Sequence, residues 1–409
     1  MKKKFLCLFL VLSICIVTLT GCYDATGVES LSYVIAIGLD KGEDNILKLS
    51  LQFATPNTIS QDSNSSSQSN TTTITTIECS SILSGLNLIN SYISKKANLS
   101  HCKIIAISEA LASDGISEYI YTLFDNVEVR PNCNIIVTRC DAIDFLENAK
   151  PTLEKLIARY YEVALNSSEY TAYTADIQLI NFYSALKSSS TQPVAILAGV
   201  NTSQTHTNST YTNKFNIDSS YKANETPIKD KTSLECMGLA VFNHDKLVGE
   251  LNGIESICYA ILTNKLNNCM ISIPNPVDTE NQVDIYLNNK RNTKITSELI
   301  NNTPYITIDI TLEGYITSSD KDEDHSSSET LKLTGDAASK YLKSQILSFA
   351  YKTSKDLKCD VVGFGKYAVS NYLTTDEWLS SDWLSNYQNA FFNVNTSINV
   401  KSGELFSML

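Results

Sequence analysis

Cys22 is the residue whose type and surroundings most directly predict a chemical modification. Residues 19–21 before it read Leu-Thr-Gly, and with the cysteine they have the form of a lipobox. Residues 2–4 are lysines and residues 5–17 form an apolar run, the basic head and hydrophobic core of a secretory signal. We therefore expect residues 1–21 to be a lipoprotein signal peptide, and Cys22 to carry an S-diacylglyceryl group and an N-acyl chain such as palmitate. The alternative is a plain signal peptide followed by a chance cysteine.

The predicted anchor indicates where the rest of the chain works. The apolar run is too short to cross a bilayer as a helix, because a span needs roughly 20 apolar residues. One acyl chain binds a membrane only marginally, whereas two anchor a protein stably. The sequence therefore predicts a body outside the lipid, tethered to the outer side of a cell membrane by its first residue.

The other reactive side chains do not form a catalytic motif. The sequence holds no Gly-x-Ser-x-Gly turn, no glycine-rich phosphate loop and no His-Glu-x-x-His motif. Several carboxylates show no spacing typical of an acid and a base: Glu29, Asp40, Glu109 and Glu128. The four histidines are isolated: His101, His206, His244 and His325. We expect no catalytic residue, no cofactor and therefore no enzyme.

A short acidic run is the nearest approach to a metal site. Residues 320–324 carry aspartate at alternate positions, as the start of a calcium loop does. However, the position that needs glycine holds His325, and the twelfth position holds Leu331 instead of glutamate. We expect a solvated acidic loop and no bound metal.

Eleven cysteines suggest a disulfide scaffold until their positions are compared. Two belong to the signal peptide, and Cys22 is the predicted lipid site. The others have no Cys-x-x-Cys spacing and mostly stand in apolar surroundings, where a free cysteine behaves as a small buried hydrophobe. They are Cys79, Cys102, Cys133, Cys140, Cys236, Cys258, Cys269 and Cys359. We expect them to be free buried thiols.

The charge of the chain excludes one class of partner. Its 44 acidic and 32 basic residues give a net charge of −12, and the predicted signal peptide removes three of the lysines. Nucleic-acid binding depends on basic patches that neutralise phosphates, so an acidic chain argues against it. The same balance argues that the lipid, rather than charge, holds the protein at a membrane.

Hydrophobic periodicity predicts an α+β chain. Apolar runs around a turn at 40–45 predict a hairpin of strands 31–39 and 46–54. Further strands are predicted at 104–107, 134–138, 236–242, 245–251, 282–287 and 304–316. Helices are predicted at 82–93, 115–124, 141–148, 152–165, 175–187, 253–264 and 336–357. Because this order is not a repeated βαβ series, we expect mixed or antiparallel sheets packed against helices, an α+β architecture. The 388 residues that remain after the predicted signal peptide suggest two to three domains.

Three polar, low-complexity segments interrupt these elements: residues 57–76, 201–233 and 317–330. Each lacks the apolar residues that would offset the entropy of ordering, so we expect loops. The second segment predicts a linker between an N-terminal domain at 22–200 and a C-terminal domain at 234–409. The role of residues 366–409 is left open.

Several stretches, in order, resemble the Ger(x)C (GerAC-like) lipoproteins, the C subunits of spore germinant receptors. The start is similar to the family's opening, although Tyr23 follows the cysteine where tryptophan is usual. Residues 38–56 resemble the family's first hairpin, and residues 98–116 its histidine–lysine strand with the following helix. Three more stretches resemble a segment ending in arginine, a second hairpin and a late Asp-x-x-x-x-Gly turn: 124–147, 237–251 and 356–365.

This resemblance implies a non-enzymatic, three-domain α+β lipoprotein on the outer face of the inner spore membrane. It also implies integral-membrane A and B subunits as partners, with which the protein would assemble or signal during germination. Direct binding of a germinant is not implied. The main alternative is a solute-binding lipoprotein of an importer, which should show two βα-rich lobes and a hinge. A lipid-anchored cell-wall hydrolase is a further alternative, but paired carboxylates or a zinc motif are missing.

Overall fold

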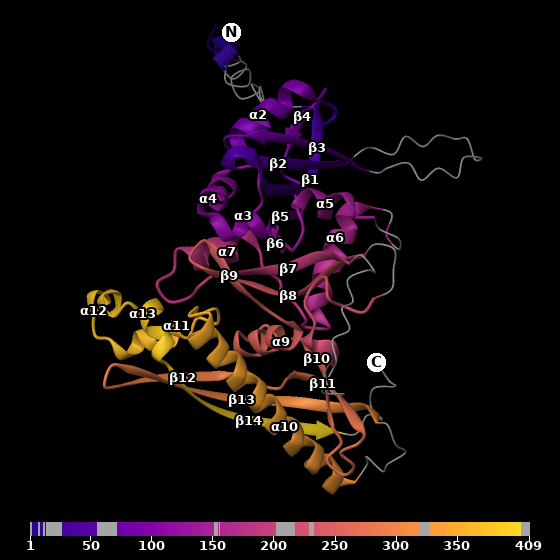
Figure 1. The fold of residues 1–409 in the computed structure, drawn as a ribbon. Helices are drawn as coiled ribbons and strands as arrows, with labels where there is room; N and C mark the ends of the chain where they lie inside the picture. Colours follow the sequence, from indigo (N-terminus) through magenta and orange to yellow (C-terminus); the bar gives the residue numbers. More distant parts are fainter. Residues whose placement is uncertain are drawn as a thin grey trace, which may run out of the picture.

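The computed structural model describes residues 27–54, 72–150, 156–201, 217–228, 233–319 and 327–401, with residue 154 and a few residues before residue 14. Its strands form two sheets, and helices lie around and between them (Figure 1). We call the first sheet with its helices the first module and the second sheet with its helices the second module. Mixed sheets packed against helices confirm the predicted fold class.

The first sheet has nine strands, in the order β3-β2-β1-β5-β6-β7-β8-β9, with β4 also beside β1. They are β1 (Leu31–Lys41), β2 (Leu47–Ala54), β3 (Thr72–Cys79), β4 (Lys96–Asn98), β5 (Ile104–Ser108), β6 (Asn134–Thr138), β7 (Val194–Asn201), β8 (Ser233–Asn243) and β9 (Lys246–Leu251). β1, β5, β6 and β7 are parallel, and antiparallel strands continue the sheet on both sides. The parallel strands are mainly apolar because helices cover both of their faces.

Helices divide between the two faces of this sheet. One core contains side chains of α2 (Ile82–Tyr92), α3 (Glu109–Asp114), α4 (Ser117–Asp125) and α7 (Leu179–Leu186). The opposite core contains side chains of α5 (Ala142–Glu147) and α6 (Ile157–Leu165). The buried carboxylate of Asp40 accepts the backbone N–H groups of Ala142 and Ile143 at 2.6 and 3.0 Å. It therefore fixes the start of α5 and the turn between β6 and this helix.

The second sheet has five strands: β10 (Asn268–Pro274), β11 (Gln282–Asn289), β12 (Lys294–Ile300), β13 (Thr303–Ser319) and β14 (Phe391–Lys401). The first four are antiparallel neighbours, whereas β14 runs parallel to β13. The long helix α10 (Ser328–Tyr351) packs against this sheet and buries Ala338, Leu342 and Ile346 in one core with the strands. Figure 1 shows the helix running across the sheet. Three short helices, α11 (Gly365–Ala368), α12 (Thr375–Ser380) and α13 (Trp383–Asn386), lead to β14.

Helix α9 (Gly253–Leu262) lies between the two sheets (Figure 1). Nine of its residues are buried, all except Glu255. A helix that is apolar on all sides must be covered on all sides. Side chains of the first sheet, α9, the second sheet and α10 accordingly form one continuous hydrophobic core. The two modules are thus joined by their interior as well as by the chain.

Some predicted boundaries were wrong. The predicted loop at 57–76 includes Thr72–Thr76, which belong to β3, and the predicted loop at 317–330 includes both the end of β13 and the start of α10. Helix α10 begins at Ser328, well before the predicted residue 336, because Ser327 caps it and accepts the N–H of Thr330. Residues 57–71 and 320–326 lie outside the described residues.

The predicted domain division at 201–233 stays a prediction. Most of that segment lies outside the described residues, although it includes the short helix α8 (Ile217–Ser220). β8 begins at the last residue of the segment and β9 follows it, and both still belong to the first sheet, since β8 pairs with β7 and β9 with β8. In the described chain, the second module begins only after Leu251.

Candidate functional site

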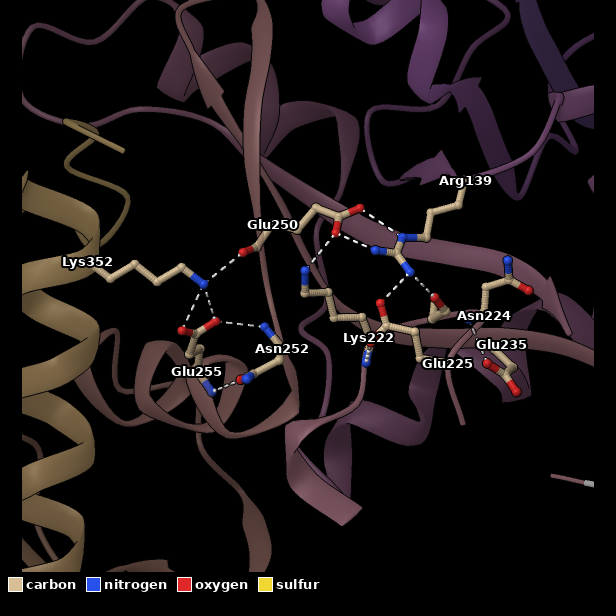
Figure 2. A network of polar contacts seen from close by, with 10 residues as sticks. Arg139, Lys222, Asn224, Glu225, Glu235, Glu250, Asn252, Glu255 and Lys352 are labelled. Carbon is tan, nitrogen blue, oxygen red and sulfur yellow. Dashed lines mark hydrogen bonds and ion pairs between the residues drawn. The ribbon is translucent and has the colours of Figure 1, made fainter. Parts of the chain in front are cut away.

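Charged side chains of both modules meet where β6, β9 and α10 end (Figure 2). We call this set the polar junction. Its members are three cations and three carboxylates: Arg139, Lys222, Lys352, Glu225, Glu250 and Glu255. They come from widely separated parts of the sequence, so only the fold brings them together.

Arg139 is the centre of the polar junction. It directly follows β6, and its backbone N–H donates to the carbonyl of Ala198 in β7 at 3.0 Å. Its Nε and Nη2 donate to the two carboxylate oxygens of Glu250 at 2.9 and 2.7 Å, and its Nη1 donates to Glu225 at 2.8 Å. The Arg139 side chain is only 20% exposed and that of Glu250 13%. A paired fork of this kind is stronger and more directional than a lysine contact.

Two lysines extend the junction towards the second module. Lys222 Nζ lies 3.0 Å from a carboxylate oxygen of Glu250. Lys352, just after α10, donates to the backbone carbonyl of Glu250 at 3.0 Å and to both carboxylate oxygens of Glu255 at 2.8 Å. Glu255 also forms a capping box with Asn252 at the start of α9. Lys352 therefore ties the end of α10 to the start of α9 and to the end of the first sheet.

The ion pairs favour the charged forms of Glu250 and Arg139. Burial alone would raise the pKa of Glu250, but hydrogen bonds from Arg139 and Lys222 outweigh it and hold the pKa below the ordinary value. Burial would likewise lower the pKa of Arg139, and the hydrogen bonds to Glu250 and Glu225 raise it instead. Both groups therefore stay charged around neutral pH. The junction can therefore hold the two modules together through charged pairs.

A second buried carboxylate organises the other side of the contact between modules. Asp360 is fully buried, and one of its oxygens accepts the N–H groups of Gly363 and Phe364 at 2.8 and 2.9 Å. The other oxygen accepts the N–H of Gly365 and the indole N–H of Trp383, both at 2.8 Å. Burial raises the pKa of the Asp360 carboxyl, while these four donors act in the opposite direction.

The Asp360 turn also contacts the first module. The backbone carbonyl of Asp360 accepts the N–H of Gln192 at 2.8 Å and the hydroxyl of Thr191 at 3.1 Å. Gly363 has a φ of +83°, a conformation that residues with a Cβ rarely adopt. The predicted Asp-x-x-x-x-Gly turn is therefore a structural device that joins the segment before β7 to α11 and α13.

The structure describes only two of the four histidines, and it does not describe the predicted lipid site. Cys22 lies outside the described residues, as do His206 and His325. His101 packs edge-on against Tyr33, with ring centroids 4.6 Å apart, and His244 stands in the β8–β9 turn with a φ of +56°. Neither histidine belongs to the polar junction.

The remaining predicted thiols and carboxylates have structural surroundings. All eight predicted free cysteines are free, and six of them are buried. Cys102 and Cys133 have sulfurs 3.5 Å apart, and burial raises the pKa of Cys133 well above its ordinary value. Asp40 caps α5, and Glu128 accepts the N–H of Leu99 at 3.2 Å. Within the described part of the chain, no three His, Cys, Asp or Glu side chains are placed to hold a metal.

Of the helices that the structure describes, none is both long and apolar enough to cross a membrane.

The sequence did not predict any member of the polar junction. Arg139 and Glu250 are 111 residues apart, and no spacing within the sequence connects them.

Two family profiles match the chain over most of its length. The profile described as spore germination protein N-terminal domain matches residues 24–200, and the one described as spore germination B3/GerAC like, C-terminal, matches residues 237–403. The chain belongs to the GerAC-like family of spore germination proteins. This confirms the family that the sequence resembles, and nothing in these matches supports the importer alternative.

Individual relatives agree with the family. The chain is 24% identical over 409 residues to the YfkR protein of Bacillus subtilis (strain 168), with 98% of each chain covered. It is 23% identical to spore germination protein KC of the same organism, covering 94% of this chain and 92% of that protein. The crystal structure of the GerBC protein matches with a TM-score of 0.52 and 15% identity, over 89% of this chain and 96% of that one. This last likeness shows a shared fold.

Proposed function

We propose that the protein is the non-enzymatic, membrane-anchored C subunit of a spore nutrient germinant receptor. The observation that carries the proposal is the match of both GerAC-like profiles, in order, over most of the chain. The near-complete alignment with spore germination protein KC supports it. The partners would be integral-membrane A and B subunits, and the protein would be needed for their assembly or signalling.

The anchor in this proposal is Cys22, lipidated after removal of residues 1–21. It would hold the protein on the outer face of the spore inner membrane. Two acyl chains would supply stable attachment, and confinement to one surface raises the effective concentration of partners without any new contact. The charged groups of the polar junction pair with one another and so hold the two modules together. This structural role is compatible with a subunit that acts by binding partners.

The experiment compares Cys22→Ala with the wild-type protein in spores that carry no redundant receptor. We expect the variant to leave the membrane fraction and nutrient-triggered germination to fall strongly. A Cys79→Ala variant is the matched control, since Cys79 is a buried thiol of the body and should not affect membrane attachment. Normal germination with an unlipidated protein would contradict the need for the anchor.

A second experiment tests the partners. The protein is captured from spore inner membranes in mild detergent, and co-purifying proteins are identified by mass spectrometry. Multi-pass receptor subunits are expected. A permease and an ATPase in their place would contradict the proposal and revive the importer alternative.

A further inference from the structure

The chain enters the first module at one end of the molecule. Leu31, the first residue of β1, pairs with Lys96 in β4, shortly after α2 ends. Glu29 and Ser30 line an open hollow of about 570 Å³ together with residues of the α2 end and residues 93–96. Figure 1 shows α2 and β4 at the end of the molecule farthest from the second sheet.

The segment that carries α2 and β4 differs in charge from the chain as a whole, although the exposed Glu29 lines the same hollow. No aspartate or glutamate occurs between Ser80 and Ser108, although the chain holds 44 acidic residues. The segment includes all of α2 and the exposed residues Lys95 and Lys96. Lys96 has one loose ion pair, with Glu128 at 3.6 Å, and its side chain is 62% exposed. Such an exposed pair is weak.

Apolar side chains also reach solvent here. Leu88 is 46% exposed and Tyr92 is 82% exposed. They are four residues apart on α2, so they lie on the same side of the helix. The buried side of α2, with Ile82 and Ile89, packs on the first sheet. The pair is therefore an outward-facing apolar patch beside two exposed lysines.

The predicted lipid anchor limits what this patch can face. Cys22 precedes Leu31 by nine residues, and nine residues span at most roughly 30 Å when fully extended. The start of β1, and the α2 end beside it, must then stay close to the lipid. An apolar pair that includes a tyrosine, flanked by lysines, suits the boundary between headgroups and acyl chains.

We propose that the surface formed by Leu88, Tyr92, Lys95 and Lys96 lies against an anionic lipid bilayer. The apolar pair enters the headgroup region, and the lysines face the lipid phosphates. The protein then stands on the membrane with its second module pointing away. This inference rests on the lipid anchor of the proposed function and adds an orientation to it.

The test uses the lipidated protein bound to vesicles of phosphatidylglycerol and phosphatidylethanolamine, with brominated acyl chains as quenchers. Tyr92→Trp places an indole in the surface, and Leu373→Trp is the matched control. Leu373 is 93% exposed and belongs to the second module. The native Trp378 and Trp383 are buried at 6% and 2% exposure, so neither should be quenched. We expect Tyr92→Trp to lose roughly one third of its emission, as one of three indoles enters the interface.

The outcomes separate orientation from anchoring. If the brominated lipids quench Tyr92→Trp and Leu373→Trp equally while the protein is bound to the vesicles, the proposed orientation is wrong and the anchor is still supported. The patch would then be a contact for a protein partner. A protein that stays in solution would overturn the anchor and the orientation together. Adding Lys95→Glu and Lys96→Glu to Tyr92→Trp should reduce the quenching on these anionic vesicles. Unchanged quenching would contradict the role of the lysines.

Discussion

Glu250 and Asp360 are carboxylates near the contact between modules, the first mostly buried and the second fully buried, yet they are stabilised in opposite ways. Glu250 is held by the cations Arg139 and Lys222, whereas Asp360 is held by N–H groups and an indole without any cation. The first therefore joins parts of the chain that are far apart, and the second shapes one local turn and binds the indole of Trp383 to it. Cationic partners lower the pKa of a carboxyl, and burial without them raises it.

The largest expected effect comes from Asp360→Asn. Each Asp360 oxygen accepts two N–H groups, so the new amide NH₂ must face two donors whichever way it is turned. We expect the free energy of unfolding to fall by about 3 kcal/mol, the cost of unsatisfied buried donors. Urea unfolding followed by tryptophan fluorescence measures it. The exposed Asp125→Asn, at the end of α4, should change stability by less than about 0.5 kcal/mol. Equal effects at both positions would refute the account of Asp360.

Arg139→Met should have the next largest effect. It leaves the mostly buried Glu250 with Lys222 alone, and removing one partner of a buried ion pair costs on the order of 2–4 kcal/mol. Glu250→Gln in the same chain should recover part of this loss, because the stranded charge is removed. A double-mutant cycle from denaturant unfolding measures the coupling. Strictly additive losses would show that the two residues do not act as a pair.

The smallest expected effects are the opposite pH dependences of the two carboxyls. The pKa of Glu250 is lowered in the folded protein, so its stabilisation is present above its ordinary pKa of 4.5 and is lost as pH falls below it. The stability difference between wild type and Glu250→Gln should therefore shrink on acidification. The pKa of Asp360 is raised, so the folded state binds its proton more tightly and loses stability as pH rises from 3.8 through the folded pKa.

Two measurements check these signs. Unfolding of wild type and Glu250→Gln across acidic pH gives the first, and carboxyl ¹³C shifts of Asp360 give the second. An Asp360 midpoint below 3.8 would mean that the four donors outweigh burial.

Local elements were predictable from the sequence where their own residues carried the signal. The hairpin of β1 and β2, helix α2 and strand β6 have clear apolar periodicity, and β6 has the predicted bounds 134–138. The same periodicity indicated α9 but not its position between two sheets. Its unusual burial depends on which surfaces cover it.

Strand β14 shows why the rest was missed. Phe392, Val394, Ile398 and Val400 are buried at alternate positions, but Thr396 interrupts the series, and its hydroxyl donates to the carbonyl of Ser339 in α10. The strand's partner, β13, lies more than 70 residues earlier in the chain. The polar junction is missed for the same reason, because pairing between distant segments has no local pattern.

The position of β8 and β9, late in the sequence but next to β7 in the first sheet, has a consequence for synthesis of the chain on the ribosome. Between Asn201 and Asn243 the ribosome must add about 40 residues before β7 gains its second neighbour, β8, which takes on the order of 2–8 s at typical elongation rates. During that interval the nascent chain carries an open strand edge, a template for pairing with other chains. A factor that shields this edge would protect the growing protein, and slow codons within 202–232 would prolong its exposure.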